Sequence, residues 1–251
     1  MYRSNNMKIR MMAIVMVALV SIATVGAMSA EDIVRQMDAL ETFDTSYAEG
    51  EIVTTDRFGV KTSTFRSWSR GAYDSLIEFT SVAERGQKVL RTEGELYLFY
   101  PDAEELIRLQ GAALRQSMLG SDISYEDMTG EKDTLSQYDV KLVGNERISG
   151  RDCYILEFSA KTRTVAYPMQ KVWVDTGTYM VWKGEFSTKA GRLLKEMAVL
   201  ETMTVDNRTL PKITKISDKM KRDSATEMRL SRLDIDVDLD PVIFTLQNLT
   251  W

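Results

Sequence analysis

The side chains best placed for chemistry are carboxylates, and the chain lacks their most common catalytic partner. Its 251 residues contain no histidine, which removes the usual Ser-His-Asp and Cys-His arrangements and the most frequent ligand of transition metals. Adjacent acids such as Glu104 with Glu105, or Glu126 with Asp127, could act as general acid and base. Neighbouring acids at a turn or helix start more often face solvent or cap the helix. We therefore expect no catalytic residue, no metal site and no cofactor.

A second group of acids lies near the C-terminus, where Asp234, Asp236, Asp238 and Asp240 occupy every second position. In a strand these side chains share one face, whereas a calcium site needs oxygen ligands that converge, and an EF-hand loop needs a glycine at its sixth position. We expect a solvent-exposed row. The single Cys153 excludes an internal disulfide and is expected to be a small buried apolar residue.

Residues 1–30 have the three parts of a secretory signal peptide. Arg3, Lys8 and Arg10 precede an apolar run of about 15 residues, shorter than the roughly 20 that a spanning helix needs. Small residues then allow cleavage after Ala27 or Ala30. The pattern predicts export to the periplasm, with residues 31–251 forming a single domain.

The charge of the chain gives no indication of a polyanionic partner. The formal net charge is −5, and loss of the basic signal segment makes the remaining chain more acidic. Because the sequence has no long run of Lys and Arg, it is a poor candidate for binding nucleic acid or an anionic membrane surface by charge.

The hydrophobic period changes early in the chain. Residues 31–42 place Ile33, Met37 and Leu40 on one helical face, and the period then falls to two. Short turns of recognisable chemistry, such as Ser149-Gly150, join the alternating segments into antiparallel hairpins. A sheet this wide must curl, which predicts a mainly β (α+β) half-barrel or barrel. The expected strands are 47–55, 61–68, 73–82, 87–92, 95–100, 105–109, 140–148, 151–160, 169–175, 179–187, 193–204, 209–220 and 226–237.

Several strand faces carry large aromatic and flexible side chains. Nine methionines lie outside the signal segment, and methionine adapts to irregular apolar ligands. The alternation predicts a deformable apolar cavity. Its expected lining from the strands is Tyr73, Ile77, Phe79, Leu96, Leu98, Tyr154, Leu156, Phe158, Met180, Trp182 and Phe186.

One segment interrupts the strands, LRQSMLGSDISYEDM at residues 114–128. Gly120 can end a helix in the left-handed conformation, and Ser124 with Asp127 has the spacing of a capping box that starts another. The pattern predicts helix, stop, helix. For residues 105–118 the sequence allows either a strand followed by a helix or one longer helix.

The run GSDISYED, with LRTEGELYLFYPDAEELIRLQ before it and KVWVDTGTYMVWKGEF and FTLQNL after it, resembles the LolA-like outer-membrane lipoprotein-sorting proteins. The resemblance spans most of the chain after the signal segment. It implies an unclosed, strongly curved antiparallel β half-barrel whose concave face is plugged by short helices and accommodates acyl chains. The interrupting segment would then be a lid over that face, with its cavity side formed by Met118, Leu119, Ile123, Tyr125 and Met128.

The function this implies is a periplasmic carrier or chaperone that shuttles acyl chains of lipoproteins or other lipids towards the outer membrane without covalent chemistry. Expected partners are an inner-membrane transporter and an outer-membrane acceptor, with a monomeric protein and no nucleic acid. The alternatives are a lipid-sensing or partner-binding regulatory domain of the same fold, an outer-membrane barrel, and a lipid hydrolase.

Overall fold

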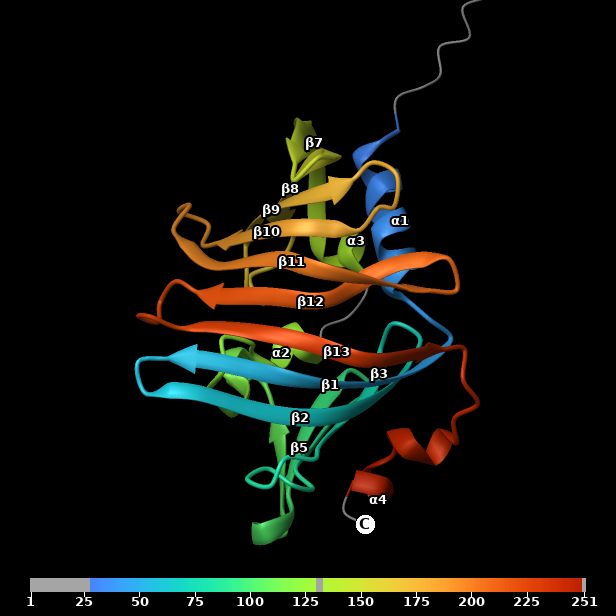
Figure 1. Ribbon diagram of the computed structural model, residues 1–251, viewed down its shortest axis with the longest axis vertical. Coiled ribbons are helices and arrows are strands. Elements are labelled where there is room, and N and C mark those ends of the chain that lie inside the picture. The colour runs from blue at the N-terminus through green and yellow to red at the C-terminus, as the bar shows by residue number, and fades with distance from the viewer. Residues whose placement is uncertain (1–27, 130–132, 250–251) are drawn as a thin grey trace, which may run out of the picture.

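The computed structural model describes residues 28–129 and 133–249 (Figure 1). The predicted signal segment therefore lies outside the described residues, apart from Met28, Ser29 and Ala30. The helices are α1 (Ala30–Glu41), α2 (Tyr125–Thr129), α3 (Thr134–Gln137) and α4 (Leu246–Leu249), with 3₁₀ turns at Pro101–Ala103, Gly111–Arg115, Met118–Gly120 and Pro241–Phe244. The strands are β1 (Thr45–Asp56), β2 (Gly59–Arg70), β3 (Asp74–Phe79), β4 (Lys88–Thr92), β5 (Glu95–Tyr100), β6 (Glu105–Leu109), β7 (Tyr138–Ile148), β8 (Arg151–Ala160), β9 (Met169–Asp175), β10 (Val181–Ser187), β11 (Leu193–Val205), β12 (Arg208–Asp218) and β13 (Ala225–Ile235).

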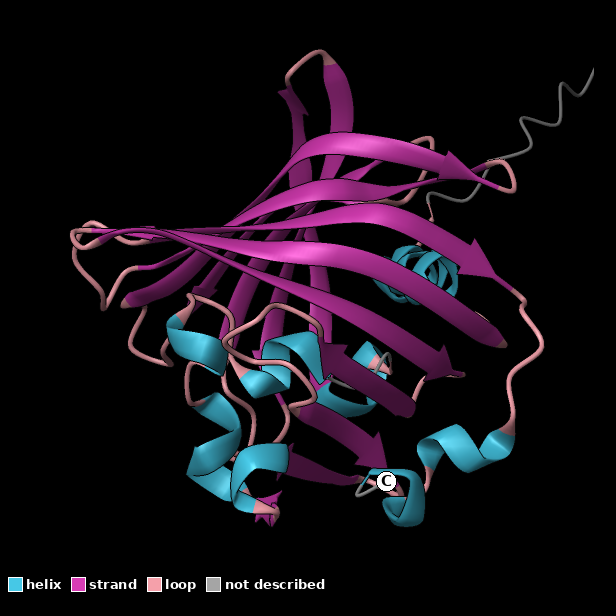
Figure 2. Cartoon of the chain, turned by 60° about the horizontal axis from the view of Figure 1, so that its bottom comes forward, coloured by secondary structure: helices cyan, strands magenta, loops and turns pink. Residues whose placement is uncertain are grey.

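These strands form one sheet in the order β6-β5-β4-β3-β2-β1-β13-β12-β11-β10-β9-β8-β7. Every neighbouring pair is antiparallel. The sheet arches over the helices without closing, because β6 and β7 remain its two edges (Figure 2). The predicted mainly β half-barrel is confirmed, as are the thirteen strands within the described part of the chain.

Eight of the thirteen predicted strand starts are wrong by one or two residues, and two of these errors lie in strands predicted to line the cavity. Tyr73 lies in the turn before β3, and Tyr179 has a left-handed backbone (φ 60°) in the turn before β10. The acidic row is also interrupted, because β13 ends at Ile235 and Asp236 adopts φ 54°. A residue with positive φ leaves the pleated strand conformation, so alternation beyond it no longer assigns a face.

Curvature arises where the register of the sheet shifts. One shift lies opposite Glu49 and Gly50, where β13 has the extra residue Ser231, and another lies opposite Phe186 and Ser187, where β11 has the extra residue Leu194. A bulge of this kind bends the strand and increases its twist. At the β7–β8 turn, Ser149 and Gly150 have φ of 49° and 83°, the two positive values that a tight hairpin turn requires.

The concave face holds two apolar clusters. In the helix cluster, α1 buries Ile33 and Val34 completely against β7, β8 and β9. Ser29 caps this helix, because its Oγ accepts a hydrogen bond from the backbone N–H of Asp32. The lid cluster joins the segment around α2 to β1–β6 and β12. Its buried members are Ile52, Phe65, Ile77, Phe79, Val89, Leu96, Leu98, Leu109, Met118, Ile123, Tyr125 and Ile216.

A third cluster lies on the opposite face of β3, β4 and β5. Phe244 and Leu249, from the segment that carries α4, pack there with Leu76 and Leu90. The strand ELYLFY is therefore covered on both faces, since Leu96 and Leu98 belong to the lid cluster while Tyr97 and Phe99 pack against the third cluster. None of the described helices is both long and apolar enough to cross a membrane.

The tight packing around Gly50 predicts that a larger side chain at this position destabilises the fold. A Cβ at this position would lie 2.5 Å from the backbone oxygen of Arg229 and 2.9 Å from Phe65 Cζ. Gly50→Ala is expected to lower the free energy of unfolding by about 1–3 kcal/mol, measured by urea denaturation. Gly144→Ala is the matched control, because its Cβ would meet only Ile155 Cδ1 at 4.0 Å. Equal stability of the two variants would contradict the packing at the bulge.

Candidate functional site

The segment Met118–Thr129, which we call the lid, lies under the arch of the sheet (Figure 2). It begins with the 3₁₀ turn Met118–Gly120 and ends with α2. The predicted stop at Gly120 and the helix after it are confirmed, whereas the predicted helix before it is only this short turn, in which Leu119 is not helical. Gly120 has φ 81°, and Leu119 before it also adopts a left-handed conformation at φ 53°. A non-glycine residue in this region is strained and is retained only where its surroundings hold it.

The predicted capping box is present at the start of α2. The backbone N–H of Ser124 donates to Asp127 Oδ2 at 2.8 Å, and the backbone N–H of Asp127 donates to Ser124 Oγ at 3.1 Å. These reciprocal bonds satisfy two amides that a helix start leaves free. Before the lid, residues 105–115 form strand β6 and then a 3₁₀ turn, which decides between the two possibilities that the sequence allowed.

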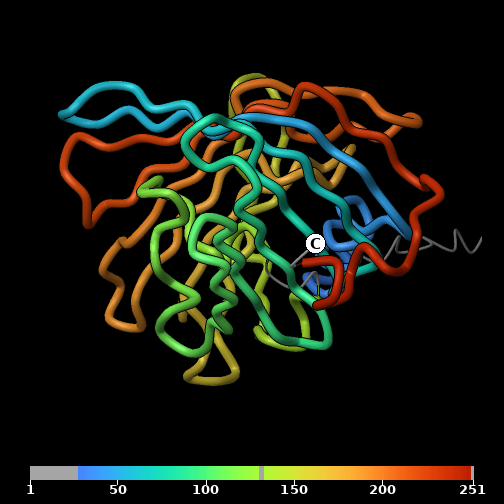
Figure 3. Tube along the Cα trace, turned by 90° about the horizontal axis from the view of Figure 1, so that it is seen from below, coloured from blue at the N-terminus to red at the C-terminus, as the bar shows by residue number. Residues whose placement is uncertain are grey.

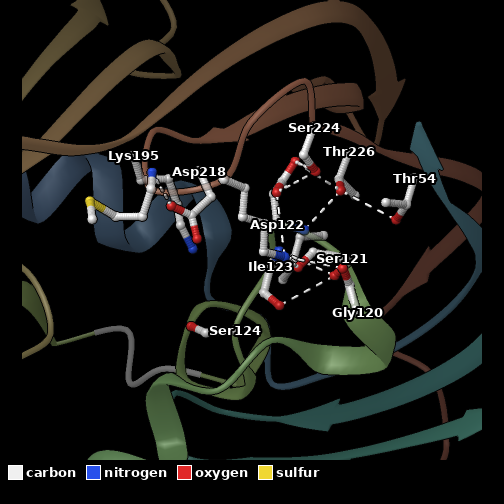
Figure 4. A network of polar contacts seen from close by, with 12 residues as sticks. Thr54, Gly120, Ser121, Asp122, Ile123, Ser124, Lys195, Asp218, Ser224 and Thr226 are labelled. Carbon is white, nitrogen blue, oxygen red and sulfur yellow. Dashed lines mark hydrogen bonds and ion pairs between the residues drawn. The ribbon is translucent and has the colours of Figure 1, made fainter. Parts of the chain in front are cut away.

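A buried carboxylate anchors the first half of the lid to the β12–β13 turn and the start of β13 (Figure 4). The Asp122 side chain is fully buried. Ser224 Oγ donates to it at 2.8 Å, Lys221 Nζ lies 3.5 Å from its Oδ1, and the Asp122 amide donates to Thr226 Oγ1 at 2.9 Å. A buried charge is tolerated only with partners of this kind.

A second anchor holds the other half of the lid. Asp127 forms an ion pair with Lys195 of β11 and accepts a 2.8 Å hydrogen bond from the Tyr167 hydroxyl. Burial and the neighbouring Asp127 charge raise the pKa of Tyr167 far above its ordinary value, so this phenol stays protonated and remains a donor. The same carboxylate therefore caps α2 and ties it to the sheet.

Two lysines hold the turn that precedes these anchors, Leu119 to Ser121, through its carbonyl oxygens. Lys61 Nζ donates to Leu119 O at 3.2 Å, and Lys221 Nζ donates to Gly120 O at 3.1 Å and to Ser121 O. Lys61 also pairs with Glu84 at 2.9 Å. These bonds hold Leu119 in its strained conformation.

Most of the residues predicted to line the cavity lie together on the concave face. Nine belong to the lid cluster or pack against it, namely Ile77, Phe79, Leu96, Leu98, Met118, Leu119, Ile123, Tyr125 and Met128. Three more, Tyr154, Leu156 and Phe158, lie in or against the helix cluster beside α1. The lid side chains Met118, Ile123 and Tyr125 are at most 8% exposed, so they fill the concave face in this conformation.

The other four predicted residues lie elsewhere. Tyr73 is 51% exposed in its turn. Trp182 is the extra residue at a register shift in β10 and packs under the Arg151 guanidinium, with 3.8 Å from the Arg151 Cζ to the ring centroid. Met180 is fully buried in the turn before β10. Phe186 packs near the second anchor, 5.1 Å from the Tyr167 ring between centroids.

A cleft of about 280 Å³ opens where the lid meets the β1–β2 hairpin. It is lined by Leu119 and Gly120 on one side and by the hairpin residues from Thr54 to Lys61 on the other. The cleft borders the lid cluster at the strained turn, because Leu119 both lines it and packs against the cluster.

Burial raises the pKa values of two groups in or beside the lid cluster, Glu126 and Tyr125. Burial raises the pKa of Glu126 above its ordinary value, although Arg115, with its Nε 3.9 Å from the Glu126 carboxylate, acts in the opposite direction. Burial and the Tyr100 hydroxyl raise the pKa of Tyr125. In the described part of the chain, no three acidic or cysteine side chains are grouped to hold a metal ion.

Sequence reasoning found the lid but missed the side chains that hold it. Lys195, Tyr167 and Lys221 come from different hairpins and are ordinary surface residue types in isolation. The only sequence feature that indicated an anchor was the motif Gly120-Ser121-Asp122. An acid placed beside apolar residues in a covering segment needs a hydrogen-bond or ion-pair partner.

A family model described as "Uncharacterized protein" matches residues 71–251. The chain belongs to that family. No functionally curated protein matches it.

Solved structures share the half-barrel along most of their length. A DUF1329 family protein from Desulfovibrio piger is 26% identical, with 88% of this chain and 97% of that chain covered at a TM-score of 0.81. A LolA superfamily protein from Nitrosomonas europaea is 25% identical, covering 88% and 100% at 0.75. A domain assigned to outer membrane lipoprotein sorting from Vibrio parahaemolyticus is 22% identical, covering 89% and 98% at 0.79, and shows the shared fold alone. The predicted resemblance to LolA-like proteins is confirmed.

The first anchor predicts a local effect on stability. Asp122→Ala removes the acceptor of Ser224 and the partner of Lys221, and is expected to lower the free energy of unfolding by about 1–3 kcal/mol. Hydrogen exchange should rise mainly at the amides of residues 118–129. Asp223→Asn is the matched control, because Asp223 is exposed and asparagine tolerates its φ of 52°. Uniformly unchanged exchange in the Asp122 variant would show that the anchor does not hold the lid.

Glu126 predicts a pH dependence. Because its folded pKa is raised, the folded state binds this proton more tightly than the unfolded state, and stability is lost as pH rises from the ordinary value of 4.5 through the folded value. Glu126→Gln should therefore be more stable than the natural protein at neutral pH. The difference in stability between Glu126→Gln and the natural protein should shrink towards zero below pH 4.5. Thermal unfolding over this pH range measures it, and a difference independent of pH would contradict the assignment.

Proposed function

We propose that this protein is a noncovalent carrier of acyl chains, taken from lipoproteins or other lipids, and that the concave face under the lid is its binding site. The observation that supports this most directly is the concave face itself. It is apolar over two adjoining clusters, and its cover is a separate segment tied down by polar anchors at Asp122 and Asp127. An anchored apolar lid is what a reversible lipid site requires.

Binding would be driven by removal of the acyl chain from water, which is worth about 0.8 kcal/mol for each buried CH₂. The side chains of Met118, Ile123 and Tyr125 occupy the face when the lid is closed. Loading therefore exchanges contacts with the lid for contacts with the acyl chain. Flexible methionines on both surfaces, such as Met118 on the lid and Met197 on the sheet, favour such an exchange.

The proposal includes a location and a processed form. We place the carrier in the periplasm, exported by the signal segment and active as one domain. Cleavage after Ala27 would keep Ser29, whose side chain caps α1, whereas cleavage after Ala30 would remove this cap and the first residue of the helix. We therefore favour the first cleavage point.

No covalent step is needed for this activity. Release requires a partner that binds the acyl chain more tightly or stabilises an open lid. An inner-membrane transporter as donor and an outer-membrane acceptor would meet this need, with the carrier itself acting as a monomer.

Native mass spectrometry of the processed protein, purified from a periplasmic fraction without detergent, tests the proposal. We expect a monomer carrying one or two additional masses that extract into organic solvent as acyl lipids. A bare mass, together with failure to take up added fatty acid, would contradict the carrier role.

A substitution at the lid turn tests the site. Leu119→Arg places a charge between the lid and the sheet and should weaken uptake of an apolar fluorescent probe at least tenfold, because burying an unpaired charge costs several kcal/mol. Leu200→Arg is the matched control, since Leu200 is 51% exposed on β11. If both variants load as the natural protein does, the lid does not cover the binding site.

A further inference from the structure

Antiparallel pairing divides the connections of the sheet between its two ends. Successive strands reverse direction, so the β1–β2, β3–β4, β5–β6, β8–β9, β10–β11 and β12–β13 turns all lie at one end. The cleft beside the lid opens at this same end. We call this end the rim. The β1–β2 hairpin and the β12–β13 turn are neighbours on it, because Thr55 pairs with Ala225 (Figure 3).

The rim carries the most exposed apolar side chains of the described residues. Val82 is 88% exposed, Phe58 is 82% exposed and Val60 is 68% exposed, and Met220 nearby is 53% exposed. Single exposed apolar residues are ordinary, whereas several at adjoining turns mark an interaction surface. The ion pair between Lys61 and Glu84 joins the hairpin to the turn that carries Val82, so these side chains are held on one surface.

The basic and acidic residues of the connecting turns are divided between the two ends of the sheet, although the chain as a whole is acidic. The turns of the rim carry four acids, of which Glu84 is buried. The connections at the opposite end carry Asp44, Glu93, Asp206, Asp236, Asp238 and Asp240 and, among these described segments, no Lys or Arg. The basic residues of the rim turns are Arg57, Arg85, Lys161, Arg163, Lys189, Arg192, Lys219, Lys221 and Arg222.

We propose that the rim docks onto an anionic phospholipid membrane surface, with Phe58, Val60, Val82 and Met220 entering the interface and the surrounding Lys and Arg side chains meeting lipid phosphates. Apolar tips flanked by basic residues bind such surfaces by combining insertion with electrostatic attraction. The exposed apolar residues project from separate turns, an arrangement that a fluid lipid surface accommodates. Membrane docking does not depend on the proposed carrier role, although the purpose we give to docking rests on that role.

Docking would act directly on the lid. Lys61 and Lys221 lie on the rim and donate to the carbonyl oxygens of Leu119 and Gly120. Lipid phosphates are stronger acceptors than these neutral carbonyls, so a docked rim would compete for the lysines at the point where the lid turn is strained. The cleft would then open towards the lipid surface.

Vesicle co-sedimentation with the processed protein tests the proposal. We expect binding to vesicles of equimolar phosphatidylglycerol and phosphatidylcholine that weakens with added salt, and little binding to phosphatidylcholine alone. Phe58→Ser should reduce binding about tenfold, and Arg222→Gln about fivefold. Leu200→Ser on β11 and Arg147→Gln at the opposite end are the matched controls and should bind as the natural protein does.

Equal binding by all four variants, or no binding to the anionic vesicles, would overturn the proposal. Binding of the rim to an acidic protein without vesicle binding would overturn it as well and would identify a protein interface instead. Probe uptake by Arg222→Gln separates this test from that of the carrier role, because Arg222 lies outside the lid and the cleft. This variant should take up the probe as the natural protein does while binding vesicles less. Full uptake by the natural protein with no vesicle binding would reject docking and leave the carrier role standing.

Discussion

The apolar concave face of the sheet must be covered, and the buried Asp122 carboxylate fixes what covers it. Thirteen antiparallel strands curve into an arch that has no second sheet to fill it. The lid fills the arch over β1–β6, and α1 fills it beside β7–β9. The lid is held both by its buried apolar side chains and by the polar anchors at Asp122 and Asp127. In the proposed carrier role it is the cover that would leave the face when an acyl chain binds.

The two anchors and the two lysines hold different parts of the lid. Asp122 and Asp127 tie the lid to the β12–β13 turn, β13 and β11, while Lys61 and Lys221 hold the strained turn that precedes the anchors from the rim. The end of the sheet where the cleft opens is also the end where basic and apolar side chains project. Cargo access, lid release and membrane docking would then occur at a single edge of the molecule.

Much of this architecture could be predicted from the sequence, because it depends on local patterns. The period-two alternation predicted the strands, the Ser124 and Asp127 spacing predicted the cap of α2, and Gly120 predicted the turn of the lid. The prediction of cavity residues failed where the backbone departs from the regular strand geometry that the alternation assumes. Trp182 is the extra residue at a register shift and lies against Arg151, and Tyr73 precedes its strand rather than starting it.

Long-range assembly could not be read from the sequence at all. The partners of Asp122 lie about a hundred positions further along the chain, at Lys221, Ser224 and Thr226. The basic residues of the rim are scattered singly and in pairs through an acidic chain, so the sequence alone indicated no attraction to an anionic surface. Only the alternation of strand direction brings these turns to one end.

Cross-linking with a photoactivatable fatty acid, followed by mapping of the labelled peptides, tests the central claim most directly. Labelling should fall on the lid and on its facing strands, at residues 77–79, 96–98 and 118–128, and excess unlabelled fatty acid should abolish it. Labelling confined to the outer face around Leu76, Leu90 and Phe244, or labelling that excess fatty acid does not reduce, would contradict a lipid site under the lid.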